Sequence, residues 1–289
     1  MQINTLSGFL LIDKPAGISS FDVIRHLRKQ TGIRTYGHAG TLDPFATGLL
    51  IIAVNKYTRL LTLLDNADKS YVASMELGSV STTGDPEGEI TQISETAIPQ
   101  AALEGLQEKV SNIKALKPPI HSAIKVNGKR SYDRARADEV FELPERESTI
   151  FDFDILDFAY PALKYSCRVS KGTYIRSLSL KIAEFLGTVS YTTELQRTAI
   201  GKISLDRAVA LADITQETLP SLLSSVHEIL PSLESLMLNE AEIMRIRNGN
   251  SVPNPGKDNN DVLILNADDN CLGTAYRKDN VIYPRINLC

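Results

Sequence analysis

The chain has 289 residues, of which 43% are hydrophobic and 23% are charged, and its formal net charge is −4 at pH 7. This composition is that of an ordinary globular protein and excludes a largely disordered chain. No apolar run approaches the roughly 18 residues that a membrane span needs, and the N-terminus lacks a basic segment followed by a long apolar one, so we expect a cytoplasmic protein.

The first predicted element is a short buried strand, SGFLLIDKPAG, which ends in a Pro-Gly turn. The next segment, SSFDVIRHLRKQTG, is predicted to be a helix because apolar residues recur at helical spacing, with Ser20 as the N-cap and Gly32 as the stop signal. Alternation along SYVASMELG then predicts a strand that places Tyr71 and Met75 on the same side.

The middle of the chain continues with mixed elements. PQAALEGLQEKVSN is predicted to be an amphipathic helix, LKYSCRVSKG a strand, and TYIRSLSLKIAEFLG a helix that ends at Gly187. Strands and helices follow one another without a steady β-α-β rhythm. The sequence therefore indicates an α+β fold rather than a doubly wound parallel sheet.

Two later regions differ in character. Residues 117–147 are polar, basic and without a clear period, which is typical of a functional insertion or of disorder. After a leucine- and serine-rich stretch near 220–231, DVLILN, CLGTAYR and VIYPRIN read as three short strands separated by polar turns. We therefore expect two domains, 1–231 and 232–289, of which the second is a compact β module.

The net charge hides an uneven distribution. From Lys109 to Arg136 there are eight Lys and Arg against one acid, whereas from Ala137 to Phe158 there are eight acids against one Arg. The basic block fits a solvated face, and it equally fits a surface for the phosphates of a nucleic acid on an otherwise acidic protein.

Asp43 is the most conspicuous candidate for chemistry, in the stretch YGHAGTLDPFATGLLIIAV. Taken alone, Asp43 and the proline after it are typical of an N-cap that opens a helix at Phe45. A phosphate-binding loop is excluded because no Lys-Ser/Thr pair follows the glycines. The three cysteines form no C-x-x-C pair and the four histidines no ligand pattern, so we expect neither a metal nor a cofactor.

Several motifs occur together in one order. DKPAGISS, GHAGTLDPFATGLL, KSYVASMELG, KPPIHSAIKVNGKRSYDRAR, SKGTYIRSL and LQRTAIG extend over residues 8–201, and with them the chain resembles the TruB family of bacterial tRNA pseudouridine-55 synthases. The resemblance implies a pseudouridine-synthase fold: a central mixed, mainly antiparallel sheet flanked by helices, followed by a PUA-like RNA-binding module. It also implies a monomeric enzyme, without a cofactor, that acts on the T stem-loop of tRNA.

By this resemblance three residues carry the reaction. Asp43 is the nucleophile, Arg176 is the arginine that pairs with it, and Tyr71 stacks on the everted base. The alternative for Arg176 is a surface arginine in the first turn of a helix, and the alternative for Tyr71 is a core aromatic residue on a strand. A guanidinium beside a buried aspartate would oppose the rise in pKa that desolvation causes.

The resemblance assigns further residues to substrate binding. His38 is inserted where the everted base has left its stack, Leu195 closes the uracil pocket, and Lys14 supports the tyrosine. Within an RNA-gripping insertion at about 117–147, phosphate contacts are expected from Lys125, Lys129, Arg130, Arg134 and Arg136. In STTGDPEGE, Thr82 stands where the family commonly carries an acid.

Two other functions are weighed against this one. A non-catalytic RNA-binding or RNA-folding protein could share the scaffold, but the set Asp43, Tyr71 and Arg176 argues against it. A glycosidase usually needs two carboxylates about 5–10 Å apart, and no second acid with a matching context accompanies Asp43 in the sequence.

Overall fold

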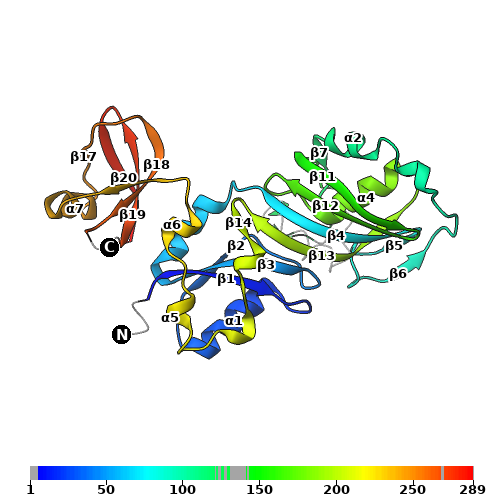
Figure 1. Cartoon of the computed structure of the whole chain (residues 1–289), viewed down its shortest axis with the longest axis horizontal. Helices are drawn as coiled ribbons and strands as arrows, with labels where there is room; N and C mark the ends of the chain where they lie inside the picture. The colour runs from blue at the N-terminus through cyan, green and yellow to red at the C-terminus, as the bar shows by residue number, and fades with distance from the viewer. Residues whose placement is uncertain are drawn as a thin grey trace.

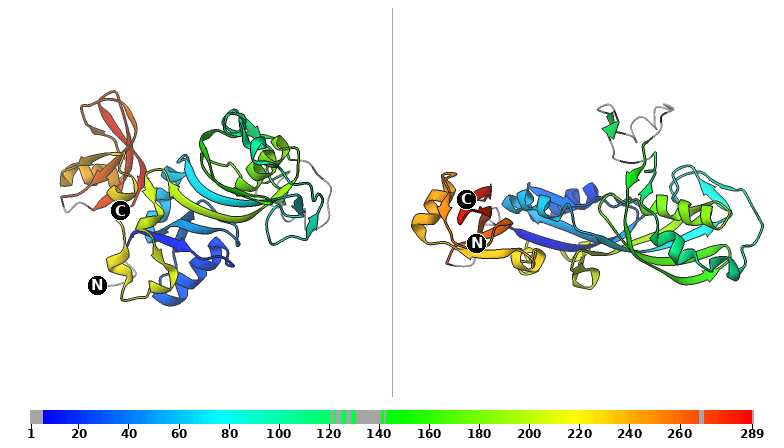
Figure 2. Two further views of the ribbon diagram at one scale, coloured as in Figure 1. Left: turned by 45° about the vertical axis from the view of Figure 1, so that its right-hand side comes forward. Right: turned by 90° about the horizontal axis from the view of Figure 1, so that it is seen from above.

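The computed structural model describes residues 6–120, 122, 125–126, 129–130, 141, 143–267 and 270–288. Within them, a large sheet with helices is followed along the long axis of the molecule by a small sheet that contains the C-terminus (Figures 1 and 2). None of the helices in these ranges is long and apolar enough to cross a membrane.

The large sheet has nine strands, in the order β11-β12-β4-β13-β3-β1-β15, with β2 paired to β3 and β14 to β13. The strands are β1 (Gly8–Lys14), β2 (Tyr36–Ala39), β3 (Thr47–Val54), β4 (Lys69–Leu77), β11 (Ile150–Ala159), β12 (Ala162–Val169), β13 (Ser190–Ile200), β14 (Ile203–Ser204) and β15 (Val209–Ala210). Only β1 with β15 and β3 with β13 run parallel. The expected mixed, mainly antiparallel sheet is confirmed.

The two halves of this sheet meet along a short seam. Strand β13 pairs with β4 from Ser190 to Ile200, but with β3 only through Gln196 and Arg197, which face Thr47 and Gly48. At the seam, a Cβ on Gly48 would lie 2.4 Å from the carbonyl oxygen of Arg197, and Gly48 has φ +98. Only glycine fits this close approach without strain.

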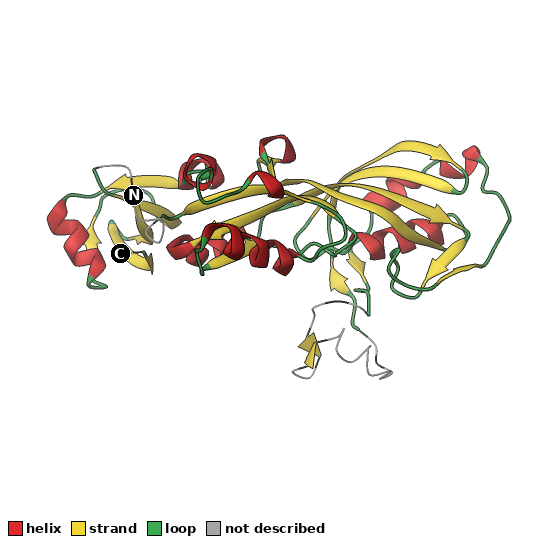
Figure 3. Cartoon of the chain, turned by 90° about the horizontal axis from the view of Figure 1, so that it is seen from below, coloured by secondary structure: helices red, strands yellow, loops and turns green. Residues whose placement is uncertain are grey.

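The helices cover the sheet in separate groups (Figure 3). They are α1 (Ser20–Thr31), α2 (Leu106–Ser111), α4 (Ile175–Phe185), α5 (Leu219–Leu222), α6 (Val226–Ile229) and the 3₁₀ segments η2 (Asn55–Leu64), η3 (Gln100–Leu103), η4 (Leu205–Arg207) and η5 (Leu211–Asp213). One apolar cluster joins α2 and α4 to β4 and β12, and another joins α1 to β1 and β3.

Helix α1 begins one residue earlier than expected. Its N-cap is Ser19, whose side chain accepts a hydrogen bond from the amide of Asp22, and it ends at Gly32 with φ 75. The helix predicted across 99–112 is wrong in its continuity. Gly105, at φ 71, separates η3 from α2, because a left-handed residue ends one helical segment before the next begins.

The small sheet has the order β16-β18-β19-β20-β17. It consists of β16 (Glu234–Met237), β17 (Val252–Pro253), β18 (Asn259–Leu265), β19 (Cys271–Lys278) and β20 (Val281–Asn287), accompanied by α7 (Glu240–Arg247). The three strands predicted here are confirmed. Leu263, Leu265 and Leu288 belong to the same buried cluster as Phe9 and Leu11 of β1, so the two sheets share an apolar core.

Three short antiparallel strand pairs complete the described elements. They are β5 (Ser79–Ser81) with β6 (Ile90–Gln92), β7 (Ala115–Leu116) with β10 (Arg146–Glu147), and β8 (Lys125–Val126) with β9 (Lys129–Arg130). The β8–β9 hairpin stands clear of the large sheet (Figure 3).

Candidate active site

Asp43 lies in the loop between β2 and β3. The amide of Ala46 donates to the carbonyl of Asp43 at 3.1 Å, and the chain then enters β3 at Thr47. No helix opens at Phe45, so the interpretation of Asp43 as an N-cap is wrong. The turn leaves the Asp43 side chain 33% exposed.

The loop around Asp43 is fixed on both sides by α1 and the turn before it. The Ser20 hydroxyl accepts from the amide of Leu42 at 2.9 Å and donates to the Leu42 carbonyl at 3.2 Å. The carbonyl of Pro44 accepts from the amide of Gly17 at 2.8 Å. These long-range hydrogen bonds hold the residues next to Asp43, which limits the freedom of its carboxylate.

Lys14 has no exposed surface, and its ammonium group is fully used by the backbone. Its Nζ donates to the carbonyls of Pro15 at 2.8 Å, Ile18 at 2.7 Å and Pro44 at 3.2 Å. Burial lowers the pKa of Lys14 to about 8, against the attraction of Asp43. Lys14 was expected to support Tyr71. Its ammonium group instead donates to three carbonyls, one of which belongs to the Asp43 loop.

Arg176, in the first turn of α4, is buried between two carboxylates. Its Nη2 lies 3.0 Å from Oδ2 of Asp43, and its Nη1 lies 2.8 Å from Oδ2 of Asp85. Nη1 also donates to the Thr83 carbonyl at 2.9 Å. With only 3% of its surface exposed, Arg176 is not the surface arginine of the alternative interpretation.

Asp85 is a residue that the sequence analysis missed. It is 2% exposed, and its Oδ1 accepts from the Glu87 amide at 3.1 Å and from the Thr83 hydroxyl. With Oδ2 on Arg176, the carboxylate has no oxygen left for a substrate, so Asp85 is a counter-ion rather than a second acid-base group. Its signal was an Asp-Pro pair after glycine, in the same turn as Thr82.

The pKa of Asp43 reflects competing effects. Desolvation raises it, the Arg176 guanidinium opposes that rise, and the charge of Asp85 adds to it, so the pKa stays above its ordinary value. Without Arg176 the rise in the pKa of Asp43 would be opposed mainly by Lys14, whose attraction is smaller.

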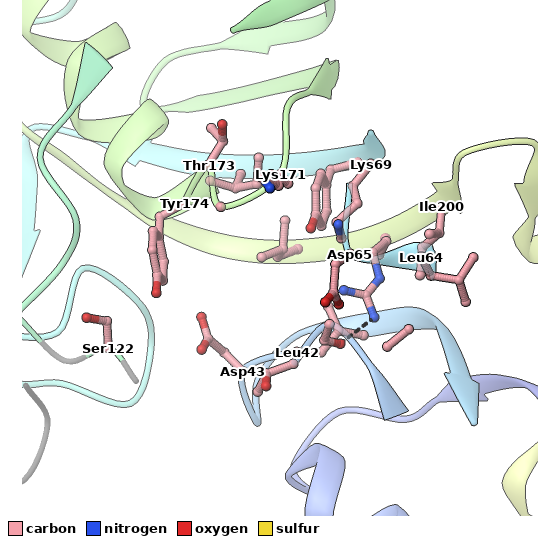
Figure 4. A pocket seen from close by; sticks show the side chains of 18 of the residues that line it. Leu42, Asp43, Leu64, Asp65, Lys69, Ser122, Lys171, Thr173, Tyr174 and Ile200 are labelled. Atoms are coloured by element: carbon pink, nitrogen blue, oxygen red, sulfur yellow. Dashed lines mark hydrogen bonds between the residues drawn. The ribbon is translucent and has the colours of Figure 1, made fainter. Parts of the chain in front are cut away.

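Asp43 opens into a pocket of about 630 Å³, whose lining includes residues of β4, β13, the Asp43 loop and the turn before α4 (Figure 4). Tyr71, which is 7% exposed, and Leu195 line it together with Asp43. Burial raises the pKa of the Tyr71 hydroxyl, although the nearby Arg197 opposes this. The structure thus brings together Asp43, Tyr71 and Leu195 in one pocket, with Arg176 behind the carboxylate.

Arg197 is a second residue that the sequence analysis left without a role, although LQRTAIG was among the motifs. It is 1% exposed, and its Nε donates to the Leu49 carbonyl at 2.8 Å and its Nη2 to the Gly40 carbonyl at 3.0 Å. The charge of its guanidinium also opposes the rise in the pKa of Tyr71. Arg197 therefore ties β13 to β3 and to the start of the Asp43 loop.

His38 is on β2, paired with Ile52 of β3, and is not among the residues that line the pocket. Its Nδ1 is buried and has no hydrogen-bond partner within the described ranges. Burial and the charge of Arg197 lower its pKa, which favours the neutral imidazole.

Three of the five predicted phosphate contacts, Lys125, Lys129 and Arg130, belong to the β8–β9 hairpin. The structure describes the backbone pairing of Lys125 with Arg130 and of Val126 with Lys129. Arg134 and Arg136 lie outside the described residues. Elsewhere in the described ranges, no group of three or more His, Cys, Asp or Glu side chains is placed to hold a metal ion.

Comparison with known proteins gives consistent matches. A family model described as TruB family pseudouridylate synthase (N terminal domain) matches residues 28–175. A tRNA pseudouridine synthase B of Burkholderia pseudomallei (strain 668) is 33% identical over 98% of the chain and 97% of its own length. One from Leifsonia xyli subsp. xyli (strain CTCB07) is 40% identical over 84% and 82%.

Among solved structures, the chain is similar to one in a Cbf5-Nop10-Gar1 complex, with a TM-score of 0.75. The sequence identity is 21%, and the match covers 100% of this chain and 86% of the other. A chain of an H/ACA RNP bound to a substrate RNA containing 2'-deoxyuridine gives a TM-score of 0.73 at 19% identity, over 98% and 85%. These two structures confirm the pseudouridine-synthase fold.

Proposed function

The chain belongs to the TruB family of pseudouridylate synthases, and on this basis we propose that it isomerises uridine to pseudouridine at position 55, in the T loop of tRNA. The observation that carries the proposal is the carboxylate of Asp43, paired at 3.0 Å with a buried arginine and open to a pocket that Tyr71 lines.

The reaction breaks the bond between C1′ and N1 of uridine, turns the uracil, and joins C1′ to C5. N1 gains a proton, C5 loses one, and no group is oxidised or supplied from elsewhere. A carboxylate nucleophile divides a difficult step of this kind into easier ones. In the proposal Asp43 plays this part, Arg176 holds it, and Asp85 holds Arg176.

The pocket would receive a base that has left its stack. Eversion costs a few kcal/mol, and stacking on an aromatic ring recovers about 1–3 kcal/mol per base. Tyr71 offers that ring, as a neutral phenol because burial raises its pKa, and Leu195 closes the apolar side. We assign His38 to the gap that the base leaves, a role its neutral imidazole suits.

The remaining assignments concern how RNA is held. Lys125, Lys129, Arg130, Arg134 and Arg136 would contact phosphates, and Lys14 would act indirectly, through the Asp43 loop. We propose a catalytic domain 1–231 and a PUA-like RNA-binding domain 232–289, working as a monomer on the T stem-loop. Because tRNA is the substrate, we place the protein in the cytoplasm.

The test is to incubate the protein with a uridine-containing tRNA transcript and to map pseudouridine chemically, beside Asp43→Asn. We expect product at position 55 only with the unaltered protein, while both bind tRNA. Equal activity of the two proteins in every RNA assay would favour the non-catalytic alternative. Product RNA that lacks a base would favour a glycosidase.

A further inference from the structure

The pocket extends beyond the reacting carboxylate to a second, cationic end. Lys69, the first residue of β4, and Lys171, in the turn before α4, both line it. In Figure 4 their side chains lie on the side of the pocket away from Ser122, with Asp43 and Tyr174 between. None of the roles proposed above uses either lysine.

Arg197 stands directly beside Lys69. A Cβ built on Gly40 would lie 3.3 Å from Nη1 of Arg197 and 3.3 Å from Cε of Lys69. The two cationic side chains therefore converge over the same glycine, in a space that any larger residue at position 40 would occupy. Gly40 also has φ 73, which disfavours other residues there.

These three cations have hydrogen-bond partners but no ionic ones among the described residues. Lys69 donates to the carbonyl of Ala67 at 3.0 Å, Lys171 donates to the Asn66 amide oxygen, and Arg197 donates to the carbonyls of Leu49 and Gly40. Two acids nearby attract Lys69 without pairing with it. Asp68 pairs with Arg168 at 2.9 Å. Asp65 lines the pocket, and its charge acts on Lys69, but the two side chains form no ion pair.

Holding like charges together in a partly buried place is unfavourable unless an anion compensates them. The arrangement has that effect on Lys69, whose pKa is lowered by burial and by the charge of Arg197, although Asp65 and Asp68 oppose this. A phosphodiester would supply one negative charge and several acceptor oxygens, and it is the anion that an RNA carries closest to its reacting base.

We propose that Lys69 and Lys171, with Arg197 behind them, form a subsite for one backbone phosphate adjacent to the everted uridine. The inference rests on the proposed function for the identity of the RNA. With the base between Tyr71 and Leu195 and the phosphate at the lysines, the nucleotide is held at two points, which sets where C1′ stands relative to Asp43. Lys69 and Lys171 are thus positioning residues for the substrate.

The experiment uses the full chain and T-stem-loop RNAs whose linkage on the 5′ or the 3′ side of the reacting uridine is either natural or a neutral methylphosphonate. Binding constants and single-turnover rates are measured for the unaltered protein, Lys69→Gln, Lys69→Arg and Lys171→Gln. Lys164→Gln is the matched control, because Lys164 is exposed and lines a separate pocket. Thermal unfolding of each variant verifies that it is folded.

We expect Lys69→Gln to weaken binding of natural RNA by about 10- to 100-fold, the loss of one charged hydrogen bond, and Lys69→Arg to restore most of it. For the unaltered protein, a neutral linkage at one of the two positions should weaken RNA binding by the same factor. On that RNA, Lys69→Gln should cause no further loss of binding. An equal effect of Lys69→Gln on all RNAs, or an effect no larger than that of Lys164→Gln, would overturn the subsite. Because this cycle measures binding constants, it tests the phosphate subsite even if no pseudouridine forms. Absence of pseudouridine would refute the proposed function and not the subsite.

Discussion

Lys14 offers the sharpest test of how the Asp43 loop is held. Its ammonium has no exposed surface and donates to three carbonyls, including that of Pro44. Replacing it in Lys14→Met removes the charge and the hydrogen bonds but keeps an apolar chain of similar length. The variant therefore reports what the buried charge does to the free energy of unfolding.

The magnitude follows from the pKa of Lys14, which burial lowers from 10.5 to about 8. Between these pH values the unfolded chain binds a proton that the folded chain does not, so the free energy of unfolding rises with pH. A difference of about 2.5 pH units corresponds to about 3 kcal/mol. This gain is absent below pH 8, where both states are protonated, and complete above 10.5.

The assay is urea unfolding of the unaltered protein and of Lys14→Met at a series of pH values from 7 to 11. Effects of other groups cancel in the difference between the two proteins. We expect that difference to move in favour of the unaltered protein by about 3 kcal/mol across the series. A difference that stays constant with pH would mean that the buried ammonium is not destabilised by its surroundings, and the reasoning would fail.

Two further predictions concern the pocket and its counter-ions. Tyr71→Leu should abolish pseudouridine formation while RNA still binds, because the stacking surface is lost, and full turnover by this variant would remove the tyrosine from the mechanism. Asp85→Asn weakens a buried contact of Arg176, which keeps its pair with Asp43, and should lower the free energy of unfolding by about 1–3 kcal/mol. Asp152, which pairs with Arg168 on the surface, gives the control: Asp152→Asn should lower the free energy of unfolding by less than about 1 kcal/mol in urea titrations. Equal losses for the two variants would contradict the assignment of Asp85 as a buried counter-ion.

Much of the fold could be predicted because local patterns and burial agree. Strand β4 alternates through Tyr71 and Met75 as the sequence indicates, and β18 to β20 fall where the apolar runs stand. The helix across 99–112 could not be predicted correctly, because spacing alone does not reveal that Gly105 adopts a left-handed conformation. Strand order was also out of reach, since β13 and β3 are joined by contacts far apart in the chain.

The site was predictable only where a motif carried it. The proximity of Asp43 and Arg176 followed from the family resemblance, and the structure places them 3.0 Å apart. Asp85 and Arg197 were missed for a physical reason: each acts through a buried ionic or backbone contact with a residue about 90 or more positions away, which leaves no local pattern. The contacts of Lys14 differed from expectation for the same reason.

The small sheet contributes leucines from β18 and from the C-terminal end to the buried cluster around Phe9. This shared cluster affects what a truncated protein can show. A chain cut after residue 231 would expose an apolar surface of the larger part to water, and such surfaces promote self-association. A shortened protein that handles tRNA poorly would therefore say little about nucleic-acid contacts made by the missing part. Point changes on the outer surface of the small sheet are the cleaner way to ask what that part touches.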